Sequence, residues 1–514
     1  MVSINALPEE LQLLVISFLE SPSPSSRKLR LEPSLSLTDS PDCTLKHLSL
    51  VSRRWRRLVL PTLFVYTRLR LDAPPDFGCN ACRVCDEAVI STSATRTPHQ
   101  PGGNVPPTDE YHAEMITAAL TQCNENLRGG RSDDEAQQMG EIAFATKERL
   151  LPSTALAWIR QWYHPMLDLI QFLQNHDLTK VVDSFVLYTD QMLGEKLHRF
   201  PHEVADKDWR FPASAAFWAH LLAVIDPTTV TILAPPIDLA CLTNCAIDTF
   251  GDWAFSEMDF HILSLRQSSP RSPKSTSCIP TYASLQPIPA TYPAIAPSSV
   301  LTLRPWTHLS LNEGPFLKAY GTYEFFERGP PSLVYSIKDS IIRNRPQLEA
   351  TWTASKPPTP RRPLSSLTSL DYTAVFPFAN HADFSPILHQ ITHLSLQLAP
   401  DAQSNILNDR ARVGKADLAD CWTELLTIYA ELVGPLASVR RPTVAVAGDP
   451  TSFTGDFTWD TSRRGVAVRK LEALDFRIKA MQEELDELFV PLCLPVWVEA
   501  EAGVFSRLQE WEGR

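Results

Sequence analysis

Apolar residues recur at helical spacing in two short stretches near the start of the chain, which predicts two amphipathic helices. The first stretch opens with Pro8, Glu9 and Glu10, which suit a first helical turn because Pro has no N–H to leave unpaired and carboxylates favour the positive end of the helix dipole. The apolar sides comprise Leu11, Leu14, Val15, Phe18 and Leu19 in the first stretch, and Leu45, Leu48, Val51, Trp55 and Leu58 in the second. Helices this short need a packed partner in water. We therefore expect a small helical cluster that keeps part of its apolar surface for another protein.

These two stretches resemble an F-box domain over about residues 4–70. The matching positions are Leu7-Pro8, Glu10-Leu11, Val15-Ile16 and Leu19, followed by Leu48, Val51, Arg54-Trp55-Arg56, Leu58 and Leu63-Phe64. One departure from the family pattern is the long connection of residues 21–42 between the helices, whose Ser and Pro content predicts a solvent-exposed loop. The alternative interpretation is an ordinary N-terminal helical hairpin.

The resemblance implies a docking role. F-box domains bind the Skp adaptor of SCF ubiquitin ligases, and through it a cullin, while the rest of the chain captures the protein to be ubiquitinated. Apolar and Trp anchors usually carry most of the binding energy of such an interface. By analogy with the family, the expected adaptor-facing residues are Leu7, Pro8, Leu11, Ile16, Leu48, Val51 and Trp55.

The charge distribution gives an independent indication of an acidic partner. Ten Lys and Arg stand against three Asp and Glu between Arg27 and Arg70, in a chain whose net charge is −12. A basic patch on an acidic protein favours fast, salt-sensitive association with an acidic surface, and the Skp adaptor of the family is acidic. A nucleic-acid partner is the alternative, but it is not expected because the positive charge is confined to one short amphipathic helix.

Further along the chain, a short apolar pattern returns several times. Apolar residues at the first, fourth and sixth positions of a hexad occur in Val182–Leu187, Trp306–Leu311, Leu367–Tyr372, Ile391–Leu396, Leu471–Phe476 and, less clearly, Pro227–Ile232. A short strand with alternating inward aliphatic residues, coupled to a helix, is the unit of a leucine-rich-repeat solenoid, and such repeats commonly follow an F-box.

The spacing of the hexads is irregular for a solenoid. Leu309 and Leu370 lie 61 residues apart, Leu370 and Leu394 only 24, and Leu394 and Leu474 80, whereas regular repeats recur every 20–29 residues. The hexads therefore belong either to a degenerate array with long insertions or to the buried strands of another α/β fold. We expect an α/β protein in which a small all-helical F-box precedes an irregular leucine-rich-repeat-like solenoid with long Pro/Ser-rich insertions.

The 514 residues predict several domains, and 44% hydrophobic content excludes a mainly disordered chain. Pro- and Ser-rich composition predicts a linker at 73–109 and insertions at about 267–299 and 354–363 within a target-binding region of 110–514. Helical patterns fall at about 110–128, 135–150 and 154–176. No apolar run is long enough to span a membrane, no signal peptide pattern is evident, and the ten Cys show no disulfide framework. A cytoplasmic or nuclear protein is expected.

Candidates for metal or thiol chemistry are few. Cys79, Cys82 and Cys85 are weak zinc candidates, because a structural site needs four ligands. His99 or His112 could supply the fourth, and three free thiols in a loop are the alternative. Cys241 and Cys245 suit the core of an apolar helix. No cofactor is expected.

No known catalytic motif is present. The chain has no Gly-rich phosphate loop, no His-Glu-x-x-His and no Gly-x-Ser-x-Gly. His308 and His393 share one position of the hexad, which indicates a solvent-facing strand position rather than a paired catalytic site. Residues 483–487 form a charged helix face.

The sequence therefore predicts a non-catalytic substrate-recognition adaptor of an SCF ubiquitin ligase. Its partners would be the Skp adaptor, a cullin through that adaptor, and an unidentified protein substrate, with no nucleic acid and no membrane. Two alternatives stay open. One is an F-box scaffold that acts outside ubiquitination, and the other is an enzyme with an unrecognised C-terminal active site.

Overall fold

The fold is described from a computed structural model that divides into two compact units. Unit 1 comprises Met1–Ile247, Asp259–Trp306 and Ala354–Pro363, and unit 2 comprises Asp248–Met258, Thr307–Thr353 and Leu364–Arg514. The structure describes residues 7–19, 28–40, 43–71, 165–190, 214, 217–245, 247, 255–257, 260–268, 299–314, 318–319, 330–343, 363–374, 376, 383–401, 404, 406–413, 417–437, 466–490, 492 and 497–508.

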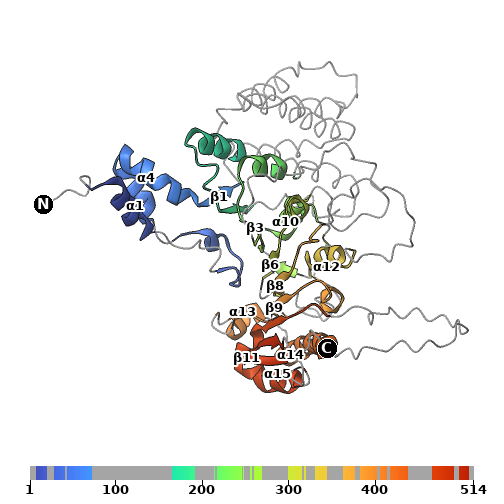
Figure 1. The fold of residues 1–514 in the computed structure, drawn as a ribbon. Helices are drawn as coiled ribbons and strands as arrows, with labels where there is room; N and C mark the ends of the chain where they lie inside the picture. The colour runs from blue at the N-terminus through green and yellow to red at the C-terminus, as the bar shows by residue number, and fades with distance from the viewer. Residues whose placement is uncertain are drawn as a thin grey trace, which may run out of the picture. The chain divides into compact units, whose positions relative to one another are not determined.

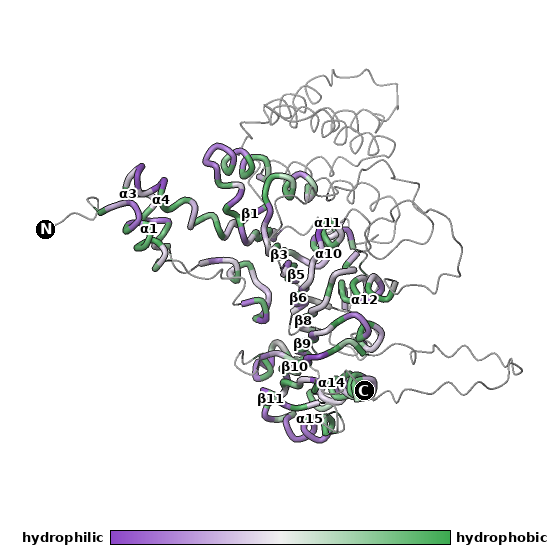
Figure 2. The backbone as a smooth tube through the Cα atoms, in the orientation of Figure 1, coloured by the Kyte–Doolittle hydropathy of each residue, from purple (hydrophilic) through white to green (hydrophobic). Residues whose placement is uncertain are grey.

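Unit 1 begins with three helices, α1 (Glu9–Ser17), α3 (Thr44–Val51) and α4 (Arg53–Phe64) (Figure 1). Ser52 separates the last two and caps α4, because its side chain accepts a hydrogen bond from the Trp55 N–H at 3.2 Å. Figure 2 shows the contrast between the hydrophobic α1 and the hydrophilic start of α4. The predicted helical cluster is thus present at the N-terminus.

The strands of unit 1 follow these helices. Their order is β1-β2-β3-β5, with β1 to β3 parallel and β5 antiparallel to β3. Their bounds are Tyr66–Arg70 (β1), Ser184–Tyr188 (β2), Thr229–Ala234 (β3) and His261–Arg266 (β5). Because β1 begins two residues after the end of α4, the helical cluster leads directly into the first strand of this sheet.

Helices cover one face of these strands. They span 165–175, 217–224, α10 (Pro236–Thr243) and α11 (Val300–Leu303), and Figure 1 shows α10 beside β3. The Phe185 and Trp218 rings meet edge to face at 6.4 Å, and the Trp218 indole N–H donates to the Leu242 carbonyl at 2.6 Å. This face of the sheet is therefore the apolar core of unit 1.

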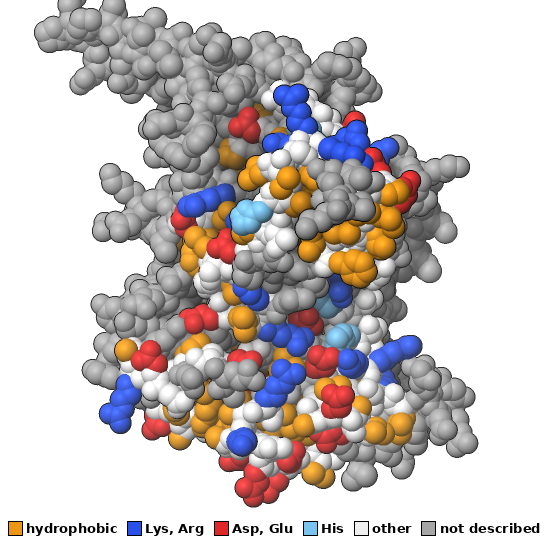
Figure 3. All heavy atoms as spheres, turned by 90° about the vertical axis from the view of Figure 1, so that its left-hand side faces the viewer, with side chains coloured by type: hydrophobic (Ala, Val, Ile, Leu, Met, Phe, Trp, Pro, Cys, Tyr) orange, Lys and Arg blue, Asp and Glu red, His pale blue; other side chains and the backbone are white. Residues whose placement is uncertain are grey.

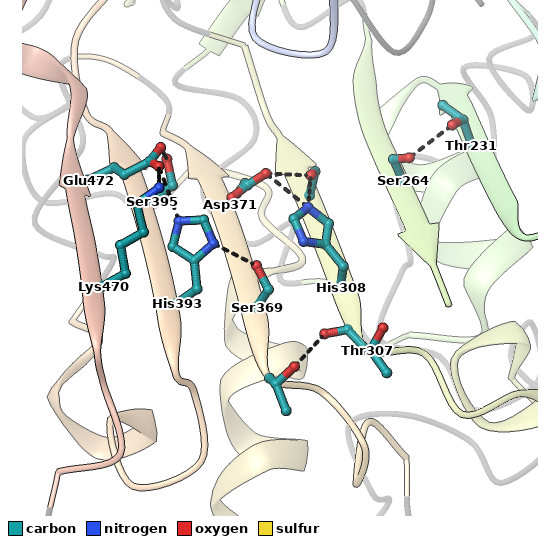
Figure 4. A network of polar contacts seen from close by, with 12 residues as sticks. Thr231, Ser264, Thr307, His308, Ser369, Asp371, His393, Ser395, Lys470 and Glu472 are labelled. Atoms are coloured by element: carbon teal, nitrogen blue, oxygen red, sulfur yellow. Dashed lines mark hydrogen bonds and ion pairs between the residues drawn. The ribbon is translucent and has the colours of Figure 1, made fainter. Parts of the chain in front are cut away.

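The opposite face of the unit 1 strands carries Tyr66, Arg68, Tyr188, Leu233 and Ile262, which the strand alternation places together. Thr231 and Ser264 share this face, with their hydroxyls 3.0 Å apart (Figure 4). A single turn of 3-10 helix, η2 (Leu35–Thr38), packs on it through Leu37. Residues 21–42 were expected to be a solvent-exposed loop. That expectation is corrected for Leu37 and Thr38, which are 7% and 2% exposed.

Unit 2 contains a second set of largely parallel strands in the order β6-β8-β9-β10-β12-β11. Strands β6 to β10 are parallel, whereas β12 and β11 are antiparallel to their neighbours. The bounds are His308–Asn312 (β6), Ser369–Thr373 (β8), His393–Gln397 (β9), Lys470–Ala473 (β10), Trp497–Glu501 (β11) and Val504–Arg507 (β12). A separate pair joins β4 (Phe255–Glu257) to β7 (Lys318–Ala319).

The leucines of the predicted hexads lie in register across the parallel strands. Leu309 pairs with Leu370, Leu370 with Leu394, and Leu394 with Leu471, and all four side chains are buried. This pairing corrects the last hexad, because Leu471 occupies the fourth position and not the first. The true copy is Val468–Ala473, three residues earlier, and the residues after Ala473 form a 3-10 turn, η11 (Leu474–Arg477).

A backbone hydrogen-bond pattern repeats with the leucines. The Thr307 carbonyl accepts from the N–H groups of Thr368 and Ser369, both at 3.0 Å. The carbonyls of Thr368 and Thr392 each accept from two successive N–H groups of the next strand in the same way, as does that of Val65 in unit 1. The strands therefore begin at equivalent points although the chain between them varies greatly in length.

Helices cover the leucine face of unit 2, and Figure 1 shows α14 and α15 together. The helices and 3-10 turns of unit 2 include α12 (Val334–Arg343), η7 (Ser385–Ile387), η9 (Ile406–Asn408), α13 (Arg410–Val413), α14 (Leu418–Ala437), η12 (Lys479–Met481) and α15 (Gln482–Phe489). Phe489 of α15 stacks on Phe505 of β12 at 4.8 Å and contacts Tyr429 of α14 at 5.5 Å. An aromatic cluster thus joins these helices to the last strands.

The predicted class, a mixed α/β protein with small N-terminal helices, is confirmed. Of the expected helices, 154–176 is represented by the described helix at 165–175, whereas 110–128 and 135–150 lie outside the described residues. The linker at 73–109 also lies outside them, as does almost all of the insertions at 267–299 and 354–363. In the part of the chain that the structure describes, no helix is both long and apolar enough to cross a bilayer.

Candidate functional site

The N-terminal helical cluster has its own small core. Ile16 of α1 packs with Trp55, Leu58 and Val59 of α4, and all four are at most 4% exposed. Leu45, Leu48 and Leu63 are partly buried against them. Gln12 is also buried, one helical turn before Ile16, and its amide donates to the Leu7 carbonyl at 3.0 Å. The inward side of α1 is therefore the Gln12–Ile16 side.

The remaining sides of α1 leave apolar side chains in solvent. Phe18 is 80% exposed and Val51, at the end of α3, is 66% exposed. We call these exposed apolar residues the docking surface; it comprises Leu11, Leu13, Leu14, Val15, Phe18, Leu50 and Val51. A contiguous exposed apolar patch on a protein surface marks an interaction site, whereas apolar residues exposed singly are ordinary.

The residues expected to face an adaptor divide between the surface and the core. Pro8, Leu11 and Val51 are exposed, and Leu7 is partly exposed. Leu48 is partly buried against the core. The structure places Ile16 and Trp55 inside the cluster. In the isolated chain these two side chains hold α1 against α4 from beneath, and their expected contact with an adaptor stays a prediction.

Basic side chains accompany the docking surface on α4. Arg53, Arg54, Arg56 and Arg57 are exposed, and Arg57 reaches α1, where it pairs with Glu9 at 3.1 Å. Figure 3 shows hydrophobic side chains next to Lys and Arg side chains on the face that it draws. The cluster therefore combines apolar anchors with positive charge.

A second group of polar residues lies on the face of unit 2 opposite the leucines. His308 of β6 contacts Asp371 of β8, with Nε2 3.0 Å from Oδ2 (Figure 4). The Ser310 hydroxyl donates to the same carboxylate oxygen at 3.0 Å and lies 3.2 Å from the same His308 nitrogen. In a nucleophilic triad, the hydroxyl and the carboxylate bind opposite ring nitrogens. This group therefore does not activate Ser310.

The next strands repeat the arrangement with His393 and Glu472. His393 Nε2 lies 3.3 Å from Glu472 Oε1, and the Ser395 hydroxyl donates to Glu472 Oε2 at 3.3 Å (Figure 4). Lys470 pairs with the same carboxylate at 2.6 Å. Burial lowers the pKa of His393 more than the nearby carboxylates raise it, so the neutral imidazole is favoured.

Ser369 lies on the other side of the His393 ring, with its hydroxyl 3.2 Å from Nδ1. Acyl transfer at Ser369 would also need N–H donors for the developing oxyanion. The Ser369 N–H donates to the Thr307 carbonyl, and that of His393 donates to Thr368. These two N–H groups are occupied by hydrogen bonds within the sheet.

Two buried carboxylates, which the sequence analysis did not single out, organise the strand ends of unit 2. Glu313 accepts hydrogen bonds from the Ser332 and Tyr372 hydroxyls, both at 2.7 Å, and from the Leu333 N–H. The second carboxylate is Asp475, which lies just after β10. Neighbouring hydrogen-bond donors occupy both carboxylates, so both are structural.

Two of the thiols that the structure describes are poor nucleophiles because burial raises their pKa. Cys241 and Cys245 are buried at the end of α10, as the sequence predicted, and burial raises the pKa of Cys245 to about 12. Burial also raises the pKa of Cys421 to about 12. Cys79, Cys82 and Cys85 lie outside the described residues. Within those residues, no group of three or more His, Cys, Asp or Glu side chains is placed to hold a metal ion.

Comparison of the chain with models of known protein families, with curated proteins and with solved structures found no match.

Proposed function

We propose that this chain is a non-catalytic substrate-recognition adaptor of an SCF-type ubiquitin ligase. Its N-terminal helices would bind the Skp adaptor and, through it, a cullin. The observation that carries the proposal is the docking surface, in which apolar residues of α1 and α3 stay exposed although the cluster has a core of its own. Each large apolar side chain that a partner buries would contribute about 1.5–3 kcal/mol.

The charge of α4 supports an acidic partner. Its four exposed arginines border the helices that carry the docking surface. A positive rim attracts an acidic surface at long range and speeds encounter. The acidic Skp adaptor of the F-box family has the complementary sign.

The strands of both units support an irregular leucine-rich-repeat-like solenoid as the target-binding region. Parallel strands with in-register leucines, a repeated backbone hydrogen bond and helices on one face are the features of such an array. The faces without helices would then present side chains such as His308, Asp371 and Glu472 to a target. Cytosol or nucleus would be the site of action.

In this role the chain performs no chemistry. It would hold a target lysine close to a ubiquitin-charged enzyme that the complex supplies, and so raise the effective concentration of the reacting groups. The alternative enzymatic function receives no support from the N–H groups of Ser369 and His393 on the polar face of unit 2, because both are already hydrogen-bonded within the sheet.

Capture of a purified Skp adaptor by the full-length chain tests the proposal. Leu11→Asp and Val51→Asp together should lower affinity at least a hundredfold, because each anchor contributes about 2 kcal/mol or more to an interface. Both side chains are exposed, so thermal stability should be unchanged. Trp55 is not a suitable position, because its loss would unfold the cluster.

Val498→Asp serves as the matched control. Val498 is an exposed apolar residue of β11, 44% exposed, and it belongs to unit 2. Adaptor capture that is equal for the wild type, the double variant and the control would refute the proposed docking surface. Co-purification of a cullin with the adaptor would favour the ligase role over an F-box scaffold acting outside ubiquitination.

A further inference from the structure

The connection between α1 and α3 contains a segment bound to the helix-free face of the unit 1 strands. Leu37 is 7% exposed and packs against Leu233 of β3 and Ile262 of β5. The partly buried residues around it are Leu29, Leu35, Tyr188 and Phe260. One apolar side chain therefore anchors this segment on the face of the sheet that also carries Tyr66 and Arg68.

A second anchor follows Leu37 directly. The Thr38 carbonyl accepts hydrogen bonds from the Tyr66 hydroxyl, at 3.3 Å, and from the Arg68 guanidinium. Asp39 pairs with the same guanidinium at 2.6 Å. Burial is the largest single influence and lowers the pKa of Arg68, but the hydrogen bond to Asp39 together with the electrostatic effects of Tyr188, Asp39 and Tyr66 outweighs it, so the pKa of Arg68 is raised. The guanidinium is thus held charged by the bound segment.

Tyr188 completes the receiving surface. Its ring lies under the Arg68 guanidinium, 5.1 Å from centroid to Cζ, and its hydroxyl accepts from Arg68 at 3.2 Å. The ring also packs against the apolar cluster that contains Leu37. One surface is therefore formed by strands β1, β2, β3 and β5. Its apolar half accommodates a leucine side chain, and its cationic half binds a carbonyl and a carboxylate.

The segment itself resembles a bound peptide more than a part of the core. Ser36 and Asp39 are exposed on either side of the buried Leu37 and Thr38. The ordered turn is four residues long, and it is held by its own bonds, such as the Thr38 hydroxyl to the Leu35 carbonyl at 3.0 Å. One apolar anchor followed by an acidic group is a compact recognition pattern.

We propose that Leu35–Asp39 is an intramolecular ligand of a peptide-binding site formed by Tyr66, Arg68, Tyr188, Leu233 and Ile262. The site takes segments of other proteins that carry a leucine two residues before an acidic side chain. This inference rests on the proposed function only where it identifies these leucine-and-acidic segments as parts of the target proteins that the adaptor would capture. A tethered ligand competes at an effective concentration of about a millimolar, so the chain's own segment restrains target binding until it is displaced.

A fluorescein-labelled peptide of residues 33–40, added to the full-length chain, tests the site by anisotropy. Leu37→Ala with Asp39→Ala in the chain removes the two anchors of the internal segment. This variant should bind the labelled peptide about tenfold or more tightly than the wild type does. Ser36→Ala is the matched control, because Ser36 is exposed in the same turn, and it should bind as weakly as the wild type.

Two further changes test the chemistry. Arg68→Gln, added to the double variant, should weaken peptide binding about tenfold. A peptide with Asp39→Asn should show a similar loss. Unchanged affinity in both cases, or equally weak binding by the double variant and the wild type at equal thermal stability, would overturn the site.

Hydrogen exchange on the wild-type chain gives a readout that needs no variant. Excess peptide should speed exchange at residues 35–39, since it displaces the internal segment. Unchanged exchange at saturating peptide would overturn the competition. Peptide binding without adaptor capture would support the site and count against the ligase role, whereas adaptor capture without peptide binding would overturn the site alone.

Discussion

Asp475 shows how strongly one buried side chain can determine local structure. Its carboxylate accepts hydrogen bonds from the Tyr429 hydroxyl at 2.7 Å and from the N–H groups of Leu398 and Ala399 at 2.8 and 3.0 Å. It thereby ties α14 and the end of β9 to the turn after β10. Burial raises the pKa of Asp475 to about 6, although these three donors oppose the increase.

This raised pKa predicts a pH-dependent stability. The unfolded chain releases the Asp475 proton near its ordinary pKa of about 3.9, whereas the folded chain keeps it up to about pH 6. The stabilisation is therefore complete below about pH 4 and is lost as the pH rises through about 6. The loss amounts to about 3 kcal/mol for a pKa difference of about two units. Urea unfolding of the wild type and of Asp475→Asn between about pH 4 and 7.5 measures it.

Asp475→Asn removes the ionisation but retains an oxygen that accepts hydrogen bonds. The free energy of unfolding of the wild type should therefore fall relative to that of the variant as the pH rises. Parallel curves for the two proteins would show that Asp475 does not titrate in this range.

Single residues also show where the sequence was insufficient. The apolar positions of α1 surround most of the helix, so the pattern could not indicate which side packs inward. The structure selects Gln12 and Ile16, four residues apart, and leaves Leu11 and Leu14 in solvent. A polar residue on the inward side is invisible to a hydrophobic pattern, because its burial depends on the Leu7 carbonyl that it binds.

At the scale of elements, the hairpin of β11 and β12 depends on one glycine. Gly503 has a φ of +76°, and a Cβ there would lie 2.4 Å from the Ala473 carbonyl oxygen and 2.8 Å from the Phe476 Cβ. Gly503→Ala should therefore destabilise unit 2 by about 2 kcal/mol or more, from backbone strain together with the clash. Thermal or urea unfolding would measure the loss.

Gly434→Ala provides the control for this prediction. Gly434 lies inside α14, and a Cβ there would meet no atom within 4 Å. Alanine should stabilise the helix by about 0.5–1 kcal/mol. Equal effects of the two substitutions would mean that the close approach at Gly503 does not constrain the hairpin.

The sequence predicted most of the strands that carry the repeated apolar hexad. The alternation in five hexads identified β2, β3, β6, β8 and β9, because buried parallel strands need apolar residues at fixed positions. Strands β11 and β12 run antiparallel and lack the hexad, so the pattern missed them. Strand β5 carries the hexad spacing at Phe260, Leu263 and Leu265, but this copy was overlooked in the sequence. In β10 the charged Lys470 and Glu472 flank Leu471, and only the pairing with β9 fixes the register.

The 3-10 turn η2 was missed for a different reason. Its sequence is short and rich in Ser, which predicts a loop. Its position is determined by partners far along the chain, such as Leu233 and Ile262. Local composition carries no information about such long-range contacts.

At the scale of the whole molecule, the proposed function predicts salt-sensitive association with the adaptor. The arginines of α4 are exposed on a chain whose net charge is −12. Raising the salt from about 50 to about 300 mM should slow association about tenfold and leave dissociation nearly unchanged, because screening acts mainly on encounter. Stopped-flow fluorescence would measure both rates.

Arg54→Gln with Arg56→Gln should flatten this salt dependence while the apolar contacts persist. A salt effect that falls entirely on dissociation would place the charges inside the interface and not at its rim.

The hairpin after β10 has a consequence for how copies of this protein meet one another. Parallel strands can add neighbours indefinitely at a bare edge, which is how fibres grow. Here the last two strands of the sheet, β12 and β11, run antiparallel to their neighbours, and β11 is the edge strand. Glu499 and Glu501 of β11 are exposed, and the pairing register shifts between them. Repulsion between like carboxylates and an irregular rim both disfavour edge-to-edge addition, so this terminus limits polymerisation into filaments.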